Sequence, residues 1–317
     1  MSYSRRFFCV GETVFDIIFK NAKPLDATPG GAMLNTAVSL GRLGLDVYLV
    51  GDYANDPVGN VIDDFLDKNN VATRFVTRYD DALSRLALAF LNDRNDAEYS
   101  FYKIRKEGKA FLNFPEPDSN DIILFGSFYG IKAEIREDLV RFLEKATEKG
   151  TLIVYDPNFR KNHLNIREEV LPFIKENIRL ASLTKGSDED FMHLFNTSDP
   201  RKVYDIVREF GADILIMTAN SKGVHVLTPN LYKHYPSHEI DPVSTVGAGD
   251  SFNAGLLYAM HSTCFSRNNL ISFQENDWDK LISMAIRFAE SVCLSFDNYI
   301  SIDFARKLGS DISISDT

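Results

Sequence analysis

The segment Val246-Gly247-Ala248-Gly249-Asp250-Ser251-Phe252 is followed directly by the apolar run Asn253-Ala254-Gly255-Leu256-Leu257-Tyr258-Ala259-Met260. Small residues ahead of an apolar run predict a helix whose first turn carries no bulky side chains. The free N–H groups and the positive dipole end of such a helix start favour a bound anion. Asp250 falls in this first turn. An ordinary glycine-rich helix start with a first-turn acid fits the same letters, because G-x-G fragments are common.

A carboxylate beside an anion site is the arrangement that phosphoryl transfer to a hydroxyl requires. The backbone N–H groups of Gly247, Ala248 and Gly249, here called the anion cradle, would stabilise charge on the phosphoryl oxygens. Asp250 would accept the proton of the attacking hydroxyl. In this interpretation, Gly247, Ala248, Gly249 and Asp250 are the catalytic residues of a phosphotransferase.

Short apolar runs alternate with amphipathic stretches along the chain. Buried parallel strands are predicted at 7–10, 47–50, 122–125, 152–155 and 213–217. Helices are predicted near 32–43, 58–69, 133–149, 201–210, 248–262 and 278–294. This alternation indicates a doubly wound α/β fold with ligands at the carboxyl edge of the sheet. Residues 12–19 and 84–103 break the alternation and are predicted as further strands.

Two distant motifs resemble the signatures of the ribokinase-like, or PfkB, family of carbohydrate kinases. The second signature matches 246–250, and the first, a Gly-Gly pair followed by Asn, matches Gly30, Gly31 and Asn35. Further matches, in family order, are Gly11-Glu12 with Asp16, Val50-Gly51-Asp52 with Asp56 and Gly59, Asp156-Pro157-Asn158-Phe159-Arg160, and Thr218 with Gly223. The chain is identified as a member of this family, with a pattern nearest to fructokinases.

The resemblance implies a ribokinase-like α/β fold. This fold is a doubly wound, mostly parallel sheet with helices on both faces and a small β-sheet lid over the sugar. We expect a single domain over 1–317, with the lid formed from about 12–30 and 84–105. The resemblance also implies that a homodimer could form through the lid.

The same resemblance implies which residues bind the sugar. The predicted sugar-binding residues are Asp16, Gly30, Gly31, Asn35, Asn158 and Arg160. Other interpretations fit the residues as well. Asp16 could lie on the wet face of its strand, the Gly-Gly pair could be a turn before a helix, and Arg160 could form a structural ion pair.

Nucleotide binding is implied for Lys185, Ser187, Thr218, Asn220 and Gly223. Ser187 and Asp190 stand where the family has an N-x-x-E element that organises magnesium largely through water, so Asp190 is the predicted metal residue. A helix cap with first-turn acids explains this pair equally well. Asn220 replaces a family glycine, and asparagine tolerates positive φ better than most residues.

Ser244 stands where the family signature usually has an aspartate that helps to bind a monovalent cation. Serine brings no charge, so we expect little dependence on K⁺. The resemblance implies ATP and Mg²⁺ as the cofactors. Asp241 is not an obvious replacement, because Pro242 intervenes.

Composition narrows the possible partners. The 317 residues carry a formal net charge of −10, which argues against nucleic acid and an anionic membrane surface as partners. Three isolated cysteines suggest a reducing, cytoplasmic location. Neither a P-loop nor a complete dinucleotide-binding motif occurs.

The predicted function is an ATP-dependent sugar kinase acting on D-fructose. Tyr102 with the cations Lys103 and Arg105 leaves 2-keto-3-deoxygluconate kinase open, because a cation there could meet a sugar acid. A ribokinase-type activity and a non-catalytic sugar sensor are also compatible with the motifs. Retention of both Asp250 and the anion cradle favours an enzyme over a sensor.

Overall fold

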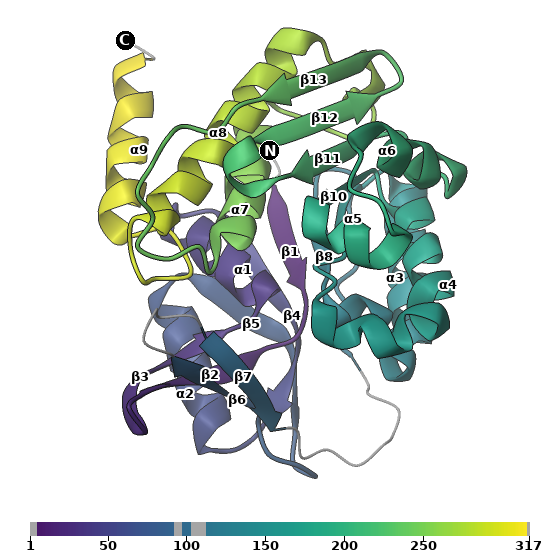
Figure 1. Cartoon of the computed structure of the whole chain (residues 1–317). Coiled ribbons are helices and arrows are strands. Elements are labelled where there is room, and N and C mark those ends of the chain that lie inside the picture. The colour runs from purple at the N-terminus through teal and green to yellow at the C-terminus, as the bar shows by residue number, and fades with distance from the viewer. Residues whose placement is uncertain (1–4, 92–96, 103–111, 316–317) are drawn as a thin grey trace.

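The computed structural model describes residues 5–91, 97–102 and 112–315, which form two sheets and the helices that cover the larger one (Figure 1). In order from one edge, the large sheet contains β13 (Leu231–Tyr235), β12 (Val224–Thr228), β11 (Leu215–Thr218), β10 (Leu183–Ser187), β9 (Leu152–Asp156), β8 (Ile122–Gly126), β1 (Arg6–Val10), β4 (Asp46–Ala54) and β5 (Val71–Tyr79). The small sheet contains β3 (Lys23–Gly30), β2 (Val14–Lys20), β6 (Leu86–Leu91) and β7 (Ala97–Tyr102).

Every neighbouring pair in the large sheet from β11 to β5 is parallel. Strands β12 and β13 continue it antiparallel at one edge. The parallel strands therefore place their carboxyl ends along the same edge, which is where ligands bind in open α/β sheets.

Helices cover both faces of this sheet. Because successive side chains of a strand point to opposite faces, each strand contributes residues to two hydrophobic cores. In β1, Phe7 and Cys9 belong to one core, whereas Phe8 and Val10 belong to the other. The first core packs under α1 (Ala32–Arg42), α2 (Pro57–Lys68), α7 (Ala248–Ser262), α8 (Glu275–Cys293) and α9 (Ile302–Ser315). The second packs under α3 (Arg136–Lys149), α4 (Arg167–Leu180), α5 (Asp188–Phe195) and α6 (Pro200–Glu209). Figure 1 shows these two groups on opposite sides of the sheet, so the doubly wound prediction is confirmed.

Short 3-10 helices complete the connections. They are η1 (Phe128–Ile131), η2 (Ala133–Ile135), η3 (Lys161–Ile166), η4 (Asn220–Lys222) and η5 (Leu270–Ser272). No helix in the described ranges combines the length and the apolar character that crossing a membrane requires.

The small sheet lies next to the carboxyl ends of the central strands. Three residues join β1 to β2, and β3 leads directly into α1. Strand β2 pairs antiparallel with β3 and parallel with β6, and β6 pairs antiparallel with β7. The strands predicted from 12–19 and 84–103 are therefore present, with somewhat different bounds. Lys103 and Arg105 lie outside the described residues.

Candidate active site

Helix α7 begins at the predicted anion cradle. Gly247 precedes it with φ 80, and a Cβ at that position would lie 2.5 Å from the backbone oxygen of Asn298. Glycine is therefore required both by the left-handed conformation and by the close approach. Of the predicted cradle, the N–H of Ala248 donates to the backbone oxygen three residues earlier at 3.3 Å. Within the described residues, the backbone N–H groups of Gly249 and Asp250 have no hydrogen-bond acceptor. These N–H groups can therefore bind an anion.

Asp250 is held by two residues of α1. Asn35 donates its Nδ2 to Asp250 Oδ2 at 2.8 Å, and the Thr36 hydroxyl donates to the Asp250 backbone oxygen at 2.9 Å. Burial raises the pKa of Asp250 to about 6, with the Asn35 bond opposing the shift. The charge of Asp156 raises this pKa further, and those of Lys185 and Arg160 lower it. A half-buried carboxylate with this pKa is ionised at neutral pH and suits a general base.

A buried charge cluster, which the sequence does not predict, lies behind Asp250. Asp156 Oδ2, at the end of β9, accepts from Lys185 Nζ at 2.9 Å and from Asn253 Nδ2 at 2.7 Å. Asp156 and Lys185 are each 3% exposed, and Asn253 is fully buried. Lys185 Nζ also lies 3.5 Å from the backbone oxygen of Gly249. The ammonium of Lys185, a predicted nucleotide-binding residue, thus contacts the backbone of the anion cradle.

Two sequence signals could have revealed this cluster. Asp156 begins the D-P-N-F-R motif directly after a buried strand, and Asn253 follows Asp250 by three residues, on the same side of α7.

The predicted sugar residue Asp16 lies against the Gly-Gly pair. A Cβ on Gly30 would lie 2.2 Å from Asp16 Oδ2, so a larger residue there would displace this carboxylate. Gly31 has φ 121, and a Cβ there would lie 2.4 Å from the backbone oxygen of Glu12. Burial raises the pKa of Asp16 to about 7. Among the described residues, no hydrogen bond or ion pair reaches the Asp16 carboxylate.

The D-P-N-F-R motif brings two further predicted sugar residues to the same sheet edge. Asn158 has φ 41 and donates its backbone N–H to Asp156 Oδ1 at 3.2 Å. Arg160 is exposed, and its charge lowers the pKa of Asp250. The structural ion pair considered for Arg160 is not found within the described residues. Arg160 therefore presents its guanidinium to solvent near Asp250.

The predicted nucleotide residues form helix caps and a turn at the neighbouring strand ends. Ser187 caps α5 in a reciprocal arrangement with Asp190, whose Oδ2 accepts from Ser187 N and Oγ, both at 2.7 Å. Thr218 ends β11. In the following turn Asn220 has φ 49, a left-handed conformation that asparagine adopts more readily than most residues other than glycine. A Cβ on Gly223, with φ 94, would lie 2.1 Å from the Tyr235 backbone oxygen.

The metal and cation predictions rest on Asp190 and Ser244. Burial, followed by the charge of Asp156, raises the pKa of Asp190, and its Ser187 bonds oppose this. In the described part of the chain, no three His, Cys, Asp or Glu side chains gather as a metal-binding group. Ser244 Oγ accepts from Val246 N at 3.2 Å. The roles of both residues stay predictions.

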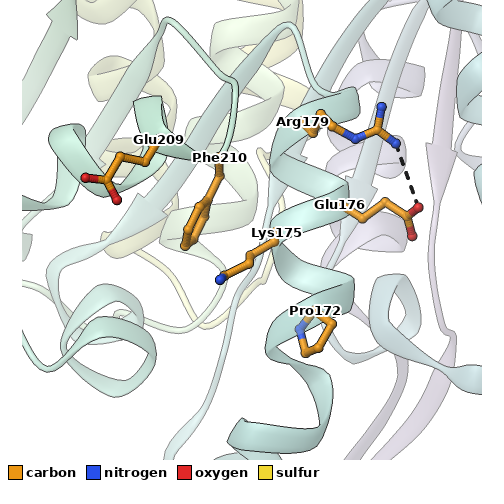
Figure 2. A pocket seen from close by; sticks show the side chains of 6 residues that line it. All are labelled: Pro172, Lys175, Glu176, Arg179, Glu209 and Phe210. Carbon is orange, nitrogen blue, oxygen red and sulfur yellow. Dashed lines mark ion pairs between the residues drawn. The ribbon is translucent and has the colours of Figure 1, made fainter.

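A separate surface hollow lies between α4 and α6. Figure 2 shows its lining residues, Pro172, Lys175, Glu176, Arg179, Glu209 and Phe210. Arg179 pairs with Glu176 at 3.8 Å, and Lys175 Nζ lies 4.8 Å from the centre of the Phe210 ring. None of the predicted site residues lines the hollow. The candidate active site is therefore the start of α7, where Asp250 lies near Asp156 at the carboxyl end of β9.

Two solved structures resemble this one in fold. Aminoimidazole riboside kinase from Salmonella enterica, complexed with aminoimidazole riboside and an ATP analogue, has a TM-score of 0.80 at 21% identity, covering 96% of this chain and 99% of that one. Fructokinase from Vibrio cholerae, in its fructose, ADP and calcium ion bound form, has a TM-score of 0.78 at 20% identity, covering 94% and 96%. The ribokinase-like fold is thereby confirmed.

Sequence comparison identifies the family. A protein of Arabidopsis thaliana named probable fructokinase-4 is 30% identical over 253 residues, which cover 77% of this chain and 77% of that protein. The family model of the pfkB family carbohydrate kinases matches residues 4–303. Since that match spans nearly the whole chain, this protein belongs to the pfkB family of carbohydrate kinases.

Proposed function

We propose that this carbohydrate kinase transfers the γ-phosphoryl group of ATP to a hydroxyl of D-fructose. The observation that carries the proposal is the placement of Asp250. Its carboxylate sits beside the available N–H groups at the start of α7 and is fixed by Asn35 from the first signature. A base and an anion site on one helix turn suit transfer of a phosphoryl group to an alcohol.

The sugar would be held between the small sheet and α1. Asn35 Oδ1 is buried and has no hydrogen-bond partner within the described residues, while its Nδ2 is engaged by Asp250. The Asp16 carboxylate is likewise an unpaired acceptor in the described part of the chain. Sugar hydroxyls are donors that satisfy both groups, because buried polar atoms are rarely left unpaired. Gly30 and Gly31 let the backbone pass close to Asp16 and Glu12, which keeps Asp16 beside the start of α1.

Phosphoryl transfer follows from this placement. The sugar hydroxyl oxygen attacks the γ-phosphorus, its proton passes to Asp250, and the bond to the ADP oxygen breaks. The free N–H groups of Gly249 and Asp250 and the guanidinium of Arg160 would stabilise charge on the transferred group. Lys185 would fix the cradle through Gly249 rather than bind phosphate as a mobile cation, since its ammonium is buried on Asp156.

ATP would lie along the neighbouring strand ends, over Ser187 and the turn from Thr218 to Gly223. Two related structures contain an ATP analogue or ADP, which supports this nucleotide. Magnesium supplies charge neutralisation on the phosphates when it is bound. Asp190 would reach it through water, since its Oδ2 is already used by the Ser187 cap.

Fructose is preferred on the chemistry of the sugar side. The residues from Gly30 to Asn35 include no cation, so they give no help to a phosphosugar. Fructokinases occur among both the sequence and the fold relatives. Aminoimidazole riboside is the second candidate, because the kinase of that name shares the fold over almost its entire length. It too is an uncharged polyhydroxyl substrate.

A substrate panel tests the proposal. We would measure kcat/KM with saturating ATP and Mg²⁺ for fructose, aminoimidazole riboside, ribose, 2-keto-3-deoxygluconate and fructose 6-phosphate. Fructose is expected to exceed each of the others by at least about tenfold, because a site with hydroxyl-pairing acceptors discriminates against analogues that leave them unpaired. A tenfold higher kcat/KM for another substrate would contradict fructose as the substrate but would still support a kinase activity. Sugar binding without turnover on any of them would indicate a sensor.

A further inference from the structure

A buried group of charges lies where the small sheet leaves the body of the molecule. Glu12 precedes β2 and Arg85 precedes β6, the two parallel neighbours of the small sheet. Arg85 Nε lies 2.9 Å from a carboxylate oxygen of Glu12. Its other nitrogens contact Asp52 of β4, at 3.0 Å from both Oδ2 and the backbone oxygen. Arg85 thus ties both entry points of the small sheet to the large sheet.

The group is largely closed to solvent and balanced in charge. Asp52 is 2% exposed and Arg85 is 7% exposed. Lys132, which follows η1, donates to the same oxygen of Glu12 at 2.9 Å. Burial alone would lower the pKa of Arg85, and the charges of Asp52 and Glu12 outweigh this and raise it. Two cations and two carboxylates therefore hold one another in place.

Arg85 also reaches the sugar side through its backbone. Its carbonyl oxygen accepts a hydrogen bond from the N–H of Phe15 at 2.9 Å, and Phe15 immediately precedes Asp16. Asp16 pairs in register with Ala87, two residues after Arg85. Asp16 has no side-chain partner in the described residues, so its position is set by its strand alone.

We propose that Arg85 is a positioning residue for sugar binding, which fixes Asp16 by joining β4 of the large sheet to β2 and β6 of the small sheet. The inference rests on the proposed sugar-binding role of Asp16. Small displacements of a binding group weaken a site strongly, so freeing β2 should reduce sugar binding. The nucleotide residues lie on other strand ends and, within the described ranges, form no ion pair with this group, so ATP binding should change little.

The test compares Arg85→Met with Arg85→Lys and with the control Arg6→Met. Arg6 is also an arginine that bonds a buried aspartate through two nitrogens, but it lies at the amino end of β1, away from the site. We expect Arg85→Met to raise KM for the sugar at least about tenfold with KM for ATP within about twofold. Arg85→Lys should recover part of the loss, because lysine keeps the charge but not the two-pronged geometry. Arg6→Met should leave both KM values near wild type.

Hydrogen exchange gives an independent measurement that needs no turnover. Backbone amides of β2 and β6 should exchange at least about tenfold faster in Arg85→Met, with α7 unchanged. If Arg85→Met does not fold, Asp52→Asn, which keeps the shape and removes one charge of the group, takes its place with the same expected outcomes. Equal increases in both KM values, or unchanged exchange in β2, would overturn the inference. Accelerated exchange in a protein that phosphorylates no sugar would instead refute the proposed function alone.

Discussion

Two carboxylates, Asp250 in the first turn of α7 and Asp16 in β2 of the small sheet, are held in different ways. Burial raises the pKa of both, to about 6 and about 7. Asp250 accepts a hydrogen bond from Asn35, and its backbone oxygen accepts another from Thr36. Among the described residues, Asp16 has no hydrogen bond to its carboxylate. The carboxylate of Asp250 therefore has a hydrogen-bond partner within the protein, whereas that of Asp16 has none among the described residues.

This difference indicates a division of roles. A general base must be in place before the reaction, and the bonds from α1 would achieve this for Asp250 in its proposed role. A recognition group gains specificity when only the correct ligand satisfies it, because a buried acceptor left unpaired is costly. We therefore propose that the body of the molecule carries the chemistry and that the small sheet recognises the sugar.

Asp250→Asn should have the largest effect. We expect kcat to fall by about 10²–10⁴-fold, the usual contribution of a general base, with KM for ATP little altered. Asparagine can still accept the hydrogen bond from Asn35, so the fold should persist. Steady-state kinetics check this, with Asp188→Asn, in the first turn of α5, as the control. A variant keeping more than about a tenth of wild-type kcat would remove Asp250 from the role of base.

Asp16→Ala should act on the sugar and spare the nucleotide. Loss of this acceptor should lower kcat/KM for fructose by about 10–100-fold, in line with about 1–3 kcal/mol for an unpaired ligand hydroxyl. KM for ATP should remain near wild type. Asp26→Ala, on the exposed neighbouring strand β3, is the matched control. Parallel losses for sugar and ATP would contradict the division of roles.

Asp16→Asn should stabilise the protein without sugar. The folded-state pKa of Asp16 is raised from 3.8 to about 7, so ionising this residue costs stability progressively as the pH rises through that range. Removing the charge should increase the free energy of unfolding by about 1–3 kcal/mol at pH 8, after a discount for partial exposure. Thermal unfolding should show no such gain near pH 4. A variant less stable than wild type at pH 8 would refute the cost assigned to Asp16.

Potassium should have the smallest effect. Ser244 replaces the charged family residue, and its Oγ accepts from Val246 N. Turnover should therefore respond weakly or not at all when KCl is exchanged for choline chloride at constant ionic strength. Strong activation that saturates at millimolar potassium would show that backbone oxygens or another acid form a cation site.

Much of this arrangement can be predicted from the sequence. The runs at 7–10 and 152–155 predict β1 and β9, because buried parallel strands are continuously apolar. The glycines of 246–250 mark the start of α7. The more polar run from Leu183 to Ser187 gives no such signal, although it forms β10. Strands β5, β12 and β13 are not predicted either.

Side-chain pairing is the least predictable feature. The family pattern implies nucleotide binding for Lys185, yet its ammonium pairs with Asp156, 29 residues away. Arg85 joins Glu12 and Asp52 only because three different strand ends meet. The tertiary fold decides which side chains form such ion pairs, so local sequence patterns do not predict them.

The pH dependence of kcat and of kcat/KM for fructose, measured in one titration of the wild type and Asp16→Asn, tests the division of roles most directly. With sugar bound, hydroxyl donors favour ionised Asp16, so kcat should rise through a single group near pH 6, assigned to Asp250. The profile of kcat/KM reports the free enzyme and should show a second group near pH 7, assigned to Asp16. That second group should vanish in Asp16→Asn. Identical profiles for kcat and kcat/KM, unchanged in Asp16→Asn, would contradict the account.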